Sequence, residues 1–465
     1  MATLPVRGEV LNEIGVVARK IGHQKIAAVL FSRAVRKNPA YATAIFNLAL
    51  TLNDLGDPDG AASCYEKSMQ LKYHEQDCEI NLAAILQNQG KLAEARTRLE
   101  SVLTRDPGNI LARMNLAIIW SCQGLRKEAL SAFQSIIAEQ PDHAMAHFAA
   151  SLELLGEGQW EKGWEEYEWR LSRSEQAKAD LITPSSTAKR WEGQDIAGKH
   201  ILLRAEQGFG DTIQFCRFAT VLHGLGARVS LSVQPALVAL VATVKGVHQA
   251  CPLGKEKDID PFEFWSPLLS VPLWLKVTER SIPGACPYFS PDARIVQAWK
   301  KRLMRREEGP RIGLVWFGNT GFVKNWTRSF PLADYAPLAG APCTFVALQC
   351  GPKGKEASHP PPGMKLIPVA HRLKDFSQTA GAIANLDLVI TVDTSVAHLA
   401  GALGKPVWTL LSYDADWRWL LERNDSPWYP SMRLYRQASL GDWGPVIEEV
   451  AHDLRNLLAS GHSAS

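Results

Sequence analysis

The sequence predicts an α-helical solenoid followed by an α/β region built on parallel sheets, because two patterns divide the chain. In the first third, one set of residues recurs every 34 positions, a period typical of stacked helical hairpins. From His200 onward, short apolar runs alternate with helical segments, which is typical of parallel α/β sheets. The length of 465 residues predicts about two to four folding units.

The composition narrows the class of protein. Hydrophobic residues make up 46% and charged residues 21%, the balance of a globular chain, and the net charge is only +3. The sequence shows no concentrated basic patch, so binding to nucleic acid or to an anionic membrane is not expected. The sequence opens without a secretory leader and holds no apolar run of the roughly 18–20 residues that span a bilayer, so a cytoplasmic protein is expected. The eight cysteines lack CxxC spacing and are expected to be reduced thiols.

Each of the first four repeats has a glycine, an alanine five residues later and a large residue four positions further on, and three of the four have a proline near the end. The glycine permits a turn between two helices, the alanine lets them approach closely, and the proline ends the second helix. An asparagine precedes a Leu-Ala pair in three units. The recurring residues are Gly22, Gly56, Gly90, Gly124 and Gly158; Ala27, Ala61, Ala95 and Ala129; Phe31, Tyr65, Leu99 and Phe133; Pro39, Pro107 and Pro141, with Tyr73 in place of the fourth proline; and Asn47, Asn81 and Asn115.

These residues resemble tetratricopeptide (TPR) repeats, with four units across 8–143 and a fifth beginning near 144, where Gly163 replaces the alanine. The fifth unit is expected to cap the array, which extends over 8–177. By this resemblance the array is a concave surface that binds a protein segment; support or dimerisation of the second domain is the alternative. The polar stretch 178–198 is predicted to be a linker.

The first α/β half, predicted over 199–305, begins with an apolar strand that runs directly into a glycine turn and a helix. Gly208 and Gly210 let the backbone approach a ligand, and Asp211 falls at the start of the helix. This position lies beyond the carboxyl end of the first strand, where open α/β sheets bind their ligands. Asp211 is therefore a candidate general base, and a simple helix cap is the alternative. The triplet Asp258–Asp260 formally spells the metal-binding DxD signature, but no metal site is expected there.

The second half, predicted over 306–460, has a strand that ends in a loop rich in glycine and cations. Lys324 and Arg328 in this loop are candidates for binding a diphosphate, and solvated loop charges are the alternative. Gln349 ends the next strand and is a further pocket candidate.

A third turn in this half is the most informative segment. A strand ends at Asp393-Thr394-Ser395, and a helix of small residues follows. The two hydroxyls and the N–H groups of the helix start form a ready anion site. His398 lies one turn into the helix, where it either contacts the same ligand or packs in the core.

Three motifs together, GFGD at 208–211, the cationic loop and VDTSVAHLAGALGKPVW at 392–408, resemble glycosyltransferase family 9, the heptosyltransferases. The resemblance implies a GT-B fold, in which two Rossmann-like halves face a cleft. It implies that Asp211 is the base and that Arg328 stands where the family has a phosphate-contacting lysine. It also implies a donor-side set consisting of Asp393, Thr394, Ser395 and His398. With DWRW at 416–419, the whole chain resembles bacterial TPR-containing glycosyltransferases, some of which modify flagellin.

The predicted chemistry is inverting, metal-independent transfer of a sugar from a nucleotide-sugar, with no further cofactor. Asp211 takes the acceptor proton, while Arg328, Lys324 and the helix start at 394–395 stabilise the departing nucleotide. Asp416 and Arg418 either close the donor pocket or form a structural ion pair, and Trp417 and Trp419 are expected to pack.

The expected acceptor is a protein, such as a flagellin or surface protein, held by the TPR array. A glycan or lipid acceptor is the second possibility. A non-enzymatic TPR adaptor with a degenerate transferase domain is the alternative from another class.

Overall fold

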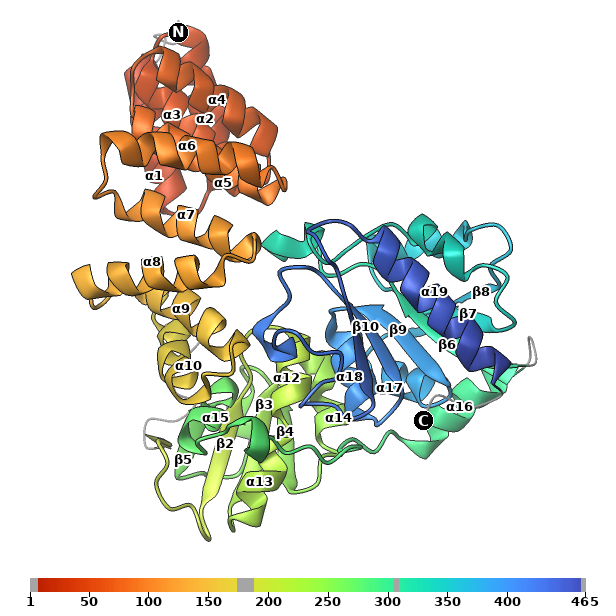
Figure 1. The fold of residues 1–465 in the computed structure, drawn as a ribbon. Helices are drawn as coiled ribbons and strands as arrows, with labels where there is room; N and C mark the ends of the chain where they lie inside the picture. Colours follow the sequence, from red (N-terminus) through yellow and green to blue (C-terminus); the bar gives the residue numbers. More distant parts are fainter. Residues whose placement is uncertain (1–6, 174–187, 305–308, 461–465) are drawn as a thin grey trace, which may run out of the picture. The chain divides into compact units, whose positions relative to one another are not determined.

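The computed structural model describes residues 7–173, 188–304 and 309–460. The chain divides into two compact units, Met1–Ala132 and Phe133–Ser465. Both predicted parts of the fold class, a helical solenoid and an α/β region with parallel sheets, are confirmed (Figure 1). None of the described helices combines the length and apolar character needed to cross a membrane.

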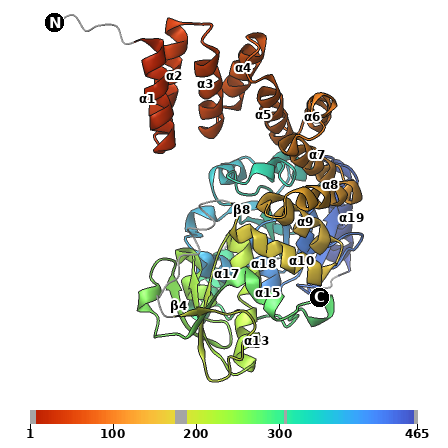
Figure 2. The same cartoon turned by 90° about the vertical axis from the view of Figure 1, so that its left-hand side faces the viewer.

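The first unit is a row of helical hairpins (Figure 2). The repeat glycines adopt the positive φ that the turn between helices requires, 84° at Gly22 and 79° at Gly56. Ala27 and Phe31 are fully buried, as close helix packing requires. The helices of this unit and the one that crosses into the next are α1 Gly8–Lys20, α2 Gln24–Lys37, α3 Ala42–Asp54, α4 Pro58–Gln70, α5 Glu75–Asn88, α6 Leu92–Arg105, α7 Ile110–Cys122 and α8 Arg126–Glu139.

The fifth repeat is part of the second unit. It consists of α9 (Ala144–Gly156), α10 (Trp160–Tyr167) and the 3-10 turn η1 (Glu168–Leu171). Its apolar side chains belong to the same continuous core as the α/β region. At Gly163 a Cβ atom would lie only 2.7 Å from the Leu155 side chain, which explains why glycine replaces the alanine of the other repeats. The predicted cap is thus built into the α/β unit.

The first sheet is entirely parallel, with strand order β1-β5-β2-β3-β4. Residues 178–187 of the predicted linker lie outside the described residues; its remainder supplies the edge strand β1 and the buried Trp191. The helix expected after the glycine turn is divided into two, α12 and α13, at Cys216 and Arg217. The elements are β1 Lys189–Arg190, β2 His200–Arg204, α12 Phe209–Phe215, α13 Phe218–Gly224, β3 Arg228–Val233, α14 Val238–Val241, β4 Val247–Pro252, β5 Phe264–Pro267, α15 Val271–Trp274 and α16 Ala293–Met304.

The second sheet is also parallel, with strand order β11-β10-β9-β6-β7-β8. Every residue of β9 and β10 is buried, as in a sheet covered on both faces. The boundary predicted at 305/306 lies outside the described residues. The elements are β6 Arg311–Val315, β7 Thr344–Ala347, β8 Leu366–Pro368, α17 Phe376–Ile383, β9 Leu388–Val392, α18 Ser395–Ala402, β10 Val407–Leu411, β11 Met432–Arg436 and α19 Gly444–Ala459.

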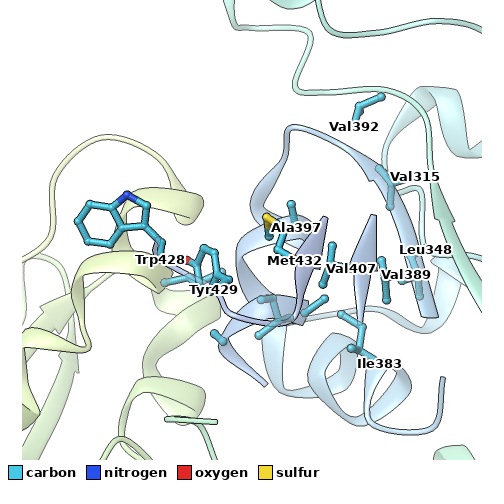
Figure 3. Close-up of a cluster of buried hydrophobic side chains, with 14 of the residues drawn as sticks. Val315, Leu348, Ile383, Val389, Val392, Ala397, Val407, Trp428, Tyr429 and Met432 are labelled. Carbon is cyan, nitrogen blue, oxygen red and sulfur yellow. The ribbon is translucent and has the colours of Figure 1, made fainter. Parts of the chain in front are cut away.

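The cores of the two α/β halves are continuous. Figure 3 shows strand residues such as Val389 and Val407 packed with Ile383 of α17, while Trp428 reaches toward the first half. There the Trp428 ring lies 5.7 Å from that of Phe215 on α12.

Strand order reverses between β2 and β5 in the first sheet and between β6 and β9 in the second. Ligands of open α/β folds bind beyond the carboxyl ends of strands at such reversals. The segments after β2, β6 and β9 contain the glycine turn, the cationic loop and the 393–395 turn. The topology therefore places the candidate residues where this fold class binds ligands.

Candidate active site

The glycine turn fixes the first carboxylate of the site. Gln207 has a positive φ of 59°, a conformation that costs free energy for a non-glycine residue. Asp211 lies in the first turn of α12, and its Oδ2 accepts the N–H of Gly208 at 2.8 Å. The N-cap is Gly208 rather than Asp211, so the simple cap considered as the alternative is not present; instead Asp211, at the third helical position, reaches back to the N-cap N–H, and this contact fixes the carboxylate in one orientation. The Asp211 side chain remains 19% exposed.

Arg418 brings the second half to this carboxylate. Its Nη2 donates to Oδ1 of Asp211 at 2.6 Å, and its Nη1 donates to Oδ1 of Asp416 at 2.9 Å. Its Nε donates to Oε1 of Gln214 at 2.7 Å, and the guanidinium stacks on the Trp417 ring. Only 7% of the Arg418 side chain is exposed. The ion pair considered for Asp416 and Arg418 is present and extends across the two halves.

The start of α18 meets the glycine turn directly. Thr394 caps the helix, and its Oγ1 accepts the N–H of Val396 at 3.3 Å. A Cβ atom added at Gly210 would lie 2.9 Å from Cδ2 of His398 and 3.7 Å from Cα of Ser395. Because Gly210 has no side chain, the segment that bears Asp211 reaches the segment that bears Thr394, Ser395 and His398.

Because the two segments approach so closely at Gly210, one methyl group added there should have a large effect on stability. We expect Gly210→Ala to push α12 away from α18 and to lower the free energy of unfolding by about 1–3 kcal/mol, because overpacking forces backbone shifts. Gly224→Ala is the matched control, since no atom lies within 4 Å of a Cβ at that helical glycine. Urea denaturation of both variants measures the difference; equal stability would contradict the contact.

His398 is packed rather than free. It is 5% exposed, its Nδ1 hydrogen-bonds with the Tyr429 hydroxyl at 3.0 Å, and its ring stacks on Trp419 at 5.2 Å. Burial lowers its pKa well below the usual range, and nearby arginines lower it further. The imidazole is therefore neutral near pH 7, and its Cδ2–Nε2 edge faces Gly210.

Two partly buried carboxylates lie near two guanidinium groups at the site. Burial raises the pKa of Asp211, and Arg418 and the Gly208 N–H oppose this rise. Burial also raises the pKa of Asp393, and Arg328 opposes it most strongly. The pKa of each carboxyl group therefore depends on an arginine from the second half.

The two candidate cations of the loop after β6 have different partners. Arg328 stacks on the exposed Phe322 ring at 4.4 Å and lies against Gly318, where a Cβ atom would be 2.8 Å from its Nε. Lys324 instead donates from Nζ to Oδ2 of Asp414 at 2.8 Å, so it has a protein carboxylate as its partner. Of the two cations, Arg328 is the one that acts on the pKa of Asp393 and His398.

Gln349 connects strand ends. Its Oε1 accepts the N–H groups of Trp316 and Phe317, and its Nε2 donates to the carbonyls of Phe317 and Cys350. All four contacts are to backbone groups, so the amide holds the ends of β6 and β7 together. Within the part of the chain that the structure describes, no group of three or more His, Cys, Asp or Glu side chains is placed to hold a metal ion.

Sequence reasoning missed the ion network behind the glycine turn. Arg170 of η1 is 2% exposed and donates to both carboxylate oxygens of Glu206, at 3.0 and 2.7 Å. Its Nη1 donates to Glu168 at 2.6 Å, and its Nη2 also donates to Oγ of Ser270 at 2.8 Å. Glu206 immediately precedes Gln207, so the fifth repeat positions the end of β2. No local pattern signals these contacts, because the partners of Arg170 come from distant parts of the sequence.

The same repeat holds the segment that bears Arg418. The Trp417 ring lies 5.3 Å from Trp164 and 6.1 Å from Tyr167, both on α10. Trp164 also donates its indole N–H to the carbonyl of Val277 at 2.9 Å. The prediction that Trp417 and Trp419 pack agrees with their exposures of 4% and 0%.

The second unit has two parallel sheets, and charged side chains gather where the strand order of each sheet reverses. This arrangement defines a GT-B-like α/β region, which is joined here to a helical repeat array. Family models agree with this class: residues 318–433 match "Glycosyltransferase family 9 (heptosyltransferase)", and residues 13–69 and 86–152 match tetratricopeptide repeats. The resemblance seen in the sequence motifs is confirmed.

The chain is similar to Protein FlbA of Caulobacter vibrioides (strain ATCC 19089 / CIP 103742 / CB 15), with 27% identity over 472 residues that cover 97% of this chain and 73% of FlbA. Solved TPR proteins are also similar to part of the chain. YrrB, described as a TPR protein with an unusual peptide-binding site, is 18% identical and covers 36% of this chain and 85% of its own, with a TM-score of 0.29. MamA is 19% identical, and the match covers 36% of this chain and 98% of the MamA chain, with a TM-score of 0.30.

Proposed function

We propose that the protein transfers a sugar from a nucleotide-sugar to an acceptor hydroxyl, with inversion and without a metal ion. The acceptor oxygen forms a bond to the anomeric carbon, the bond from that carbon to the diphosphate breaks, and the acceptor proton moves to Asp211. The observation that carries this proposal is the contact across Gly210, which brings Asp211 next to the segment 394–398.

The charges around this contact support the proposal. The leaving diphosphate would meet the Arg328 guanidinium and the N–H groups at the start of α18, two features that favour anions. Thr394 caps that helix, and Ser395 is its first residue. A partly buried site strengthens these interactions because little water competes with them.

A pH profile tests the role of Asp211. The base must be ionised, so kcat/KM should rise with pH through the pKa of Asp211, at a higher pH than for an ordinary aspartate because burial raises this pKa. Arg418→Gln removes the cation that opposes the rise and should move the ascending limb to still higher pH. Arg423→Gln is the control, since its partners are Glu279 and Asp425. A limb that does not move in Arg418→Gln would count against Asp211 as the base.

Arg328 is predicted to bind the donor. We expect Arg328→Ala to raise the KM for the nucleotide-sugar about tenfold to a hundredfold, because a hydrogen bond to a charged group contributes about 1.5–3 kcal/mol. Arg328→Lys should recover part of this loss, since it keeps the charge without the forked geometry. The exposed Arg294→Ala is the control. An unchanged donor KM in Arg328→Ala would remove this residue from the site.

The proposed acceptor is a protein, such as a flagellin or surface protein, held by the TPR array. The two TPR matches support this choice because such repeats are protein-binding surfaces. Holding the acceptor and the donor on one chain raises the local concentration of the acceptor hydroxyl. Asn47, Asn81 and Asn115 recur once on each of α3, α5 and α7 and mark successive positions along the array.

The proposal is tested in two steps. A thermal-shift panel of UDP-, GDP-, ADP- and CMP-sugars identifies the donor, and intact-mass analysis of co-expressed candidate proteins detects transfer. A mass increase of one sugar on the candidate supports the proposal. Binding of the candidate without any mass increase, and without stabilisation by any nucleotide-sugar, would instead identify a non-enzymatic TPR adaptor.

A further inference from the structure

The first helix of the repeat array carries an apolar stripe that faces outward. Its members recur every three or four residues, so they lie along one face of α1. Their exposures are far above those of core residues: Val10 47%, Ile14 49%, Val17 57% and Ile21 64%. Two more exposed apolar residues, Ile26 at 54% and Val29 at 50%, belong to α2, which packs against α1.

The positions of Val10, Ile14 and Val17 are buried in the following hairpins, whereas Leu55, at the position of Ile21, is 38% exposed. The residues 34 positions later, Ala44, Leu48 and Thr51, are exposed by only 0%, 8% and 0%. The residues a further 34 positions on, Cys78, Leu82 and Ile85, are exposed by 0%, 3% and 4%. There this face packs against the preceding hairpin. The stripe on α1 thus has the composition of a surface that another helix covers.

The neighbouring helix α2 also carries exposed apolar residues at positions that are not apolar in the later repeats. The positions of Ile26 and Val29 are occupied in later repeats by glycine or polar residues, namely Gly60, Glu94, Glu128, Ser63, Thr97 and Ser131. An exposed apolar face of this kind on a repeat is typical of an interface between proteins.

The charges beside the stripe indicate which surface covers it. With about 100° of rotation per residue, Glu9, Glu13 and Lys20 fall on one flank of the stripe. The opposite flank holds Leu11 and Ala18, which are buried in the array. The exposed flank is therefore acidic toward the start of α1 and basic toward its end.

We propose that a second copy of this chain docks on the stripe, with the two α1 helices antiparallel about a two-fold axis between Ile14 and Val17. This arrangement sets Ile14 against Val17 of the second copy and Val10 against Ile21 of the second copy. The exposed flanks then face each other, and Lys20 lies between Glu9 and Glu13 of the second copy. Such an interface is self-complementary, as two-fold symmetry requires. In a parallel pairing these flanks lie on opposite sides, and the charges meet no opposite charge.

Sedimentation velocity of the full chain at increasing concentration tests this interface. We expect a dimer whose dissociation constant rises at least tenfold in Val17→Asp, because each copy places a carboxylate in the apolar contact. The control is Leu111→Asp, which changes an apolar residue on α7 that is 54% exposed. A chain that stays monomeric at every concentration, or a Val17→Asp variant that dimerises like the parent, overturns the proposal.

Charge exchange tests the antiparallel arrangement. Lys20→Glu alone should weaken the dimer, and the triple variant Glu9→Lys/Glu13→Lys/Lys20→Glu should restore it, because every opposite pair is recreated with reversed sign. Unchanged circular dichroism shows that each variant folds. A triple variant that stays as weak as Lys20→Glu contradicts this pairing. The inference does not depend on the proposed activity, since sedimentation requires no substrate.

Discussion

Asp211→Asn should abolish sugar transfer while leaving the protein folded. We expect kcat to fall by about 10²–10⁴, the contribution typical of a general base, because the amide cannot take the acceptor proton. The amide oxygen can still accept from Gly208 or Arg418, so the shape of the turn is retained. Transfer to the acceptor is measured by intact mass over time, with donor binding measured by thermal shift.

The stability of this variant provides an internal control. The pKa of Asp211 is raised in the folded protein, so this group favours folding below its unfolded pKa, and the benefit is lost as pH rises through the folded pKa. Above the pKa of the folded protein the ionised carboxylate therefore opposes folding, and there the neutral amide should not lower the unfolding midpoint. Asp195→Asn, on an exposed loop, is the matched control for activity. Unchanged transfer by Asp211→Asn would sink the assignment of the base.

Arg170→Ala should produce the largest loss of stability. The guanidinium is the partner of Glu206 and Glu168, and its side chain is 1% exposed. Its removal leaves the Glu206 carboxylate, which is only 15% exposed, without its guanidinium partner, which costs about 3–5 kcal/mol, while Glu168 keeps Arg190 as a partner. Transfer should also fall, because Glu206 fixes the end of β2 just before the glycine turn.

Chemical denaturation followed by tryptophan fluorescence measures this loss. The fluorescence reports mainly the second unit, because Trp120 is the one tryptophan of the sequence that precedes residue 133. Arg190→Ala is the control: it also pairs with Glu168, but its side chain is 33% exposed, and it should cost about 1 kcal/mol or less. An Arg170→Ala variant within about 1 kcal/mol of the parent would show that the fifth repeat does not hold this half together.

The sequence predicted those features that short-range patterns encode. Glycines such as Gly22 and Gly56 marked the hairpin turns because only a residue tolerant of positive φ fits there. The turns at 208–211 and 393–395 were recognisable because each directly follows a buried strand. The edge strand β1 was missed because two residues inside a polar stretch carry no strand pattern.

Contacts between distant segments were not predictable in the same way. Nothing near Arg418 in the sequence indicates that it pairs with Asp211, since 207 residues separate them. The break between α12 and α13 also depends on distant groups. Arg217, at the break, donates to the carbonyls of Pro283 and Trp428, and its guanidinium lies over the rings of Tyr288 and Tyr429. Such contacts appear only once the chain has folded.

Hydrogen–deuterium exchange with and without the donor tests the central claim most directly. The first N–H groups of a helix lack partners within it and exchange quickly unless a ligand covers them. If one donor contacts both halves, amides at 208–212 and at 394–398 should gain protection together, and Arg328→Ala should lose both gains. Protection confined to one segment at saturating donor would contradict the shared site.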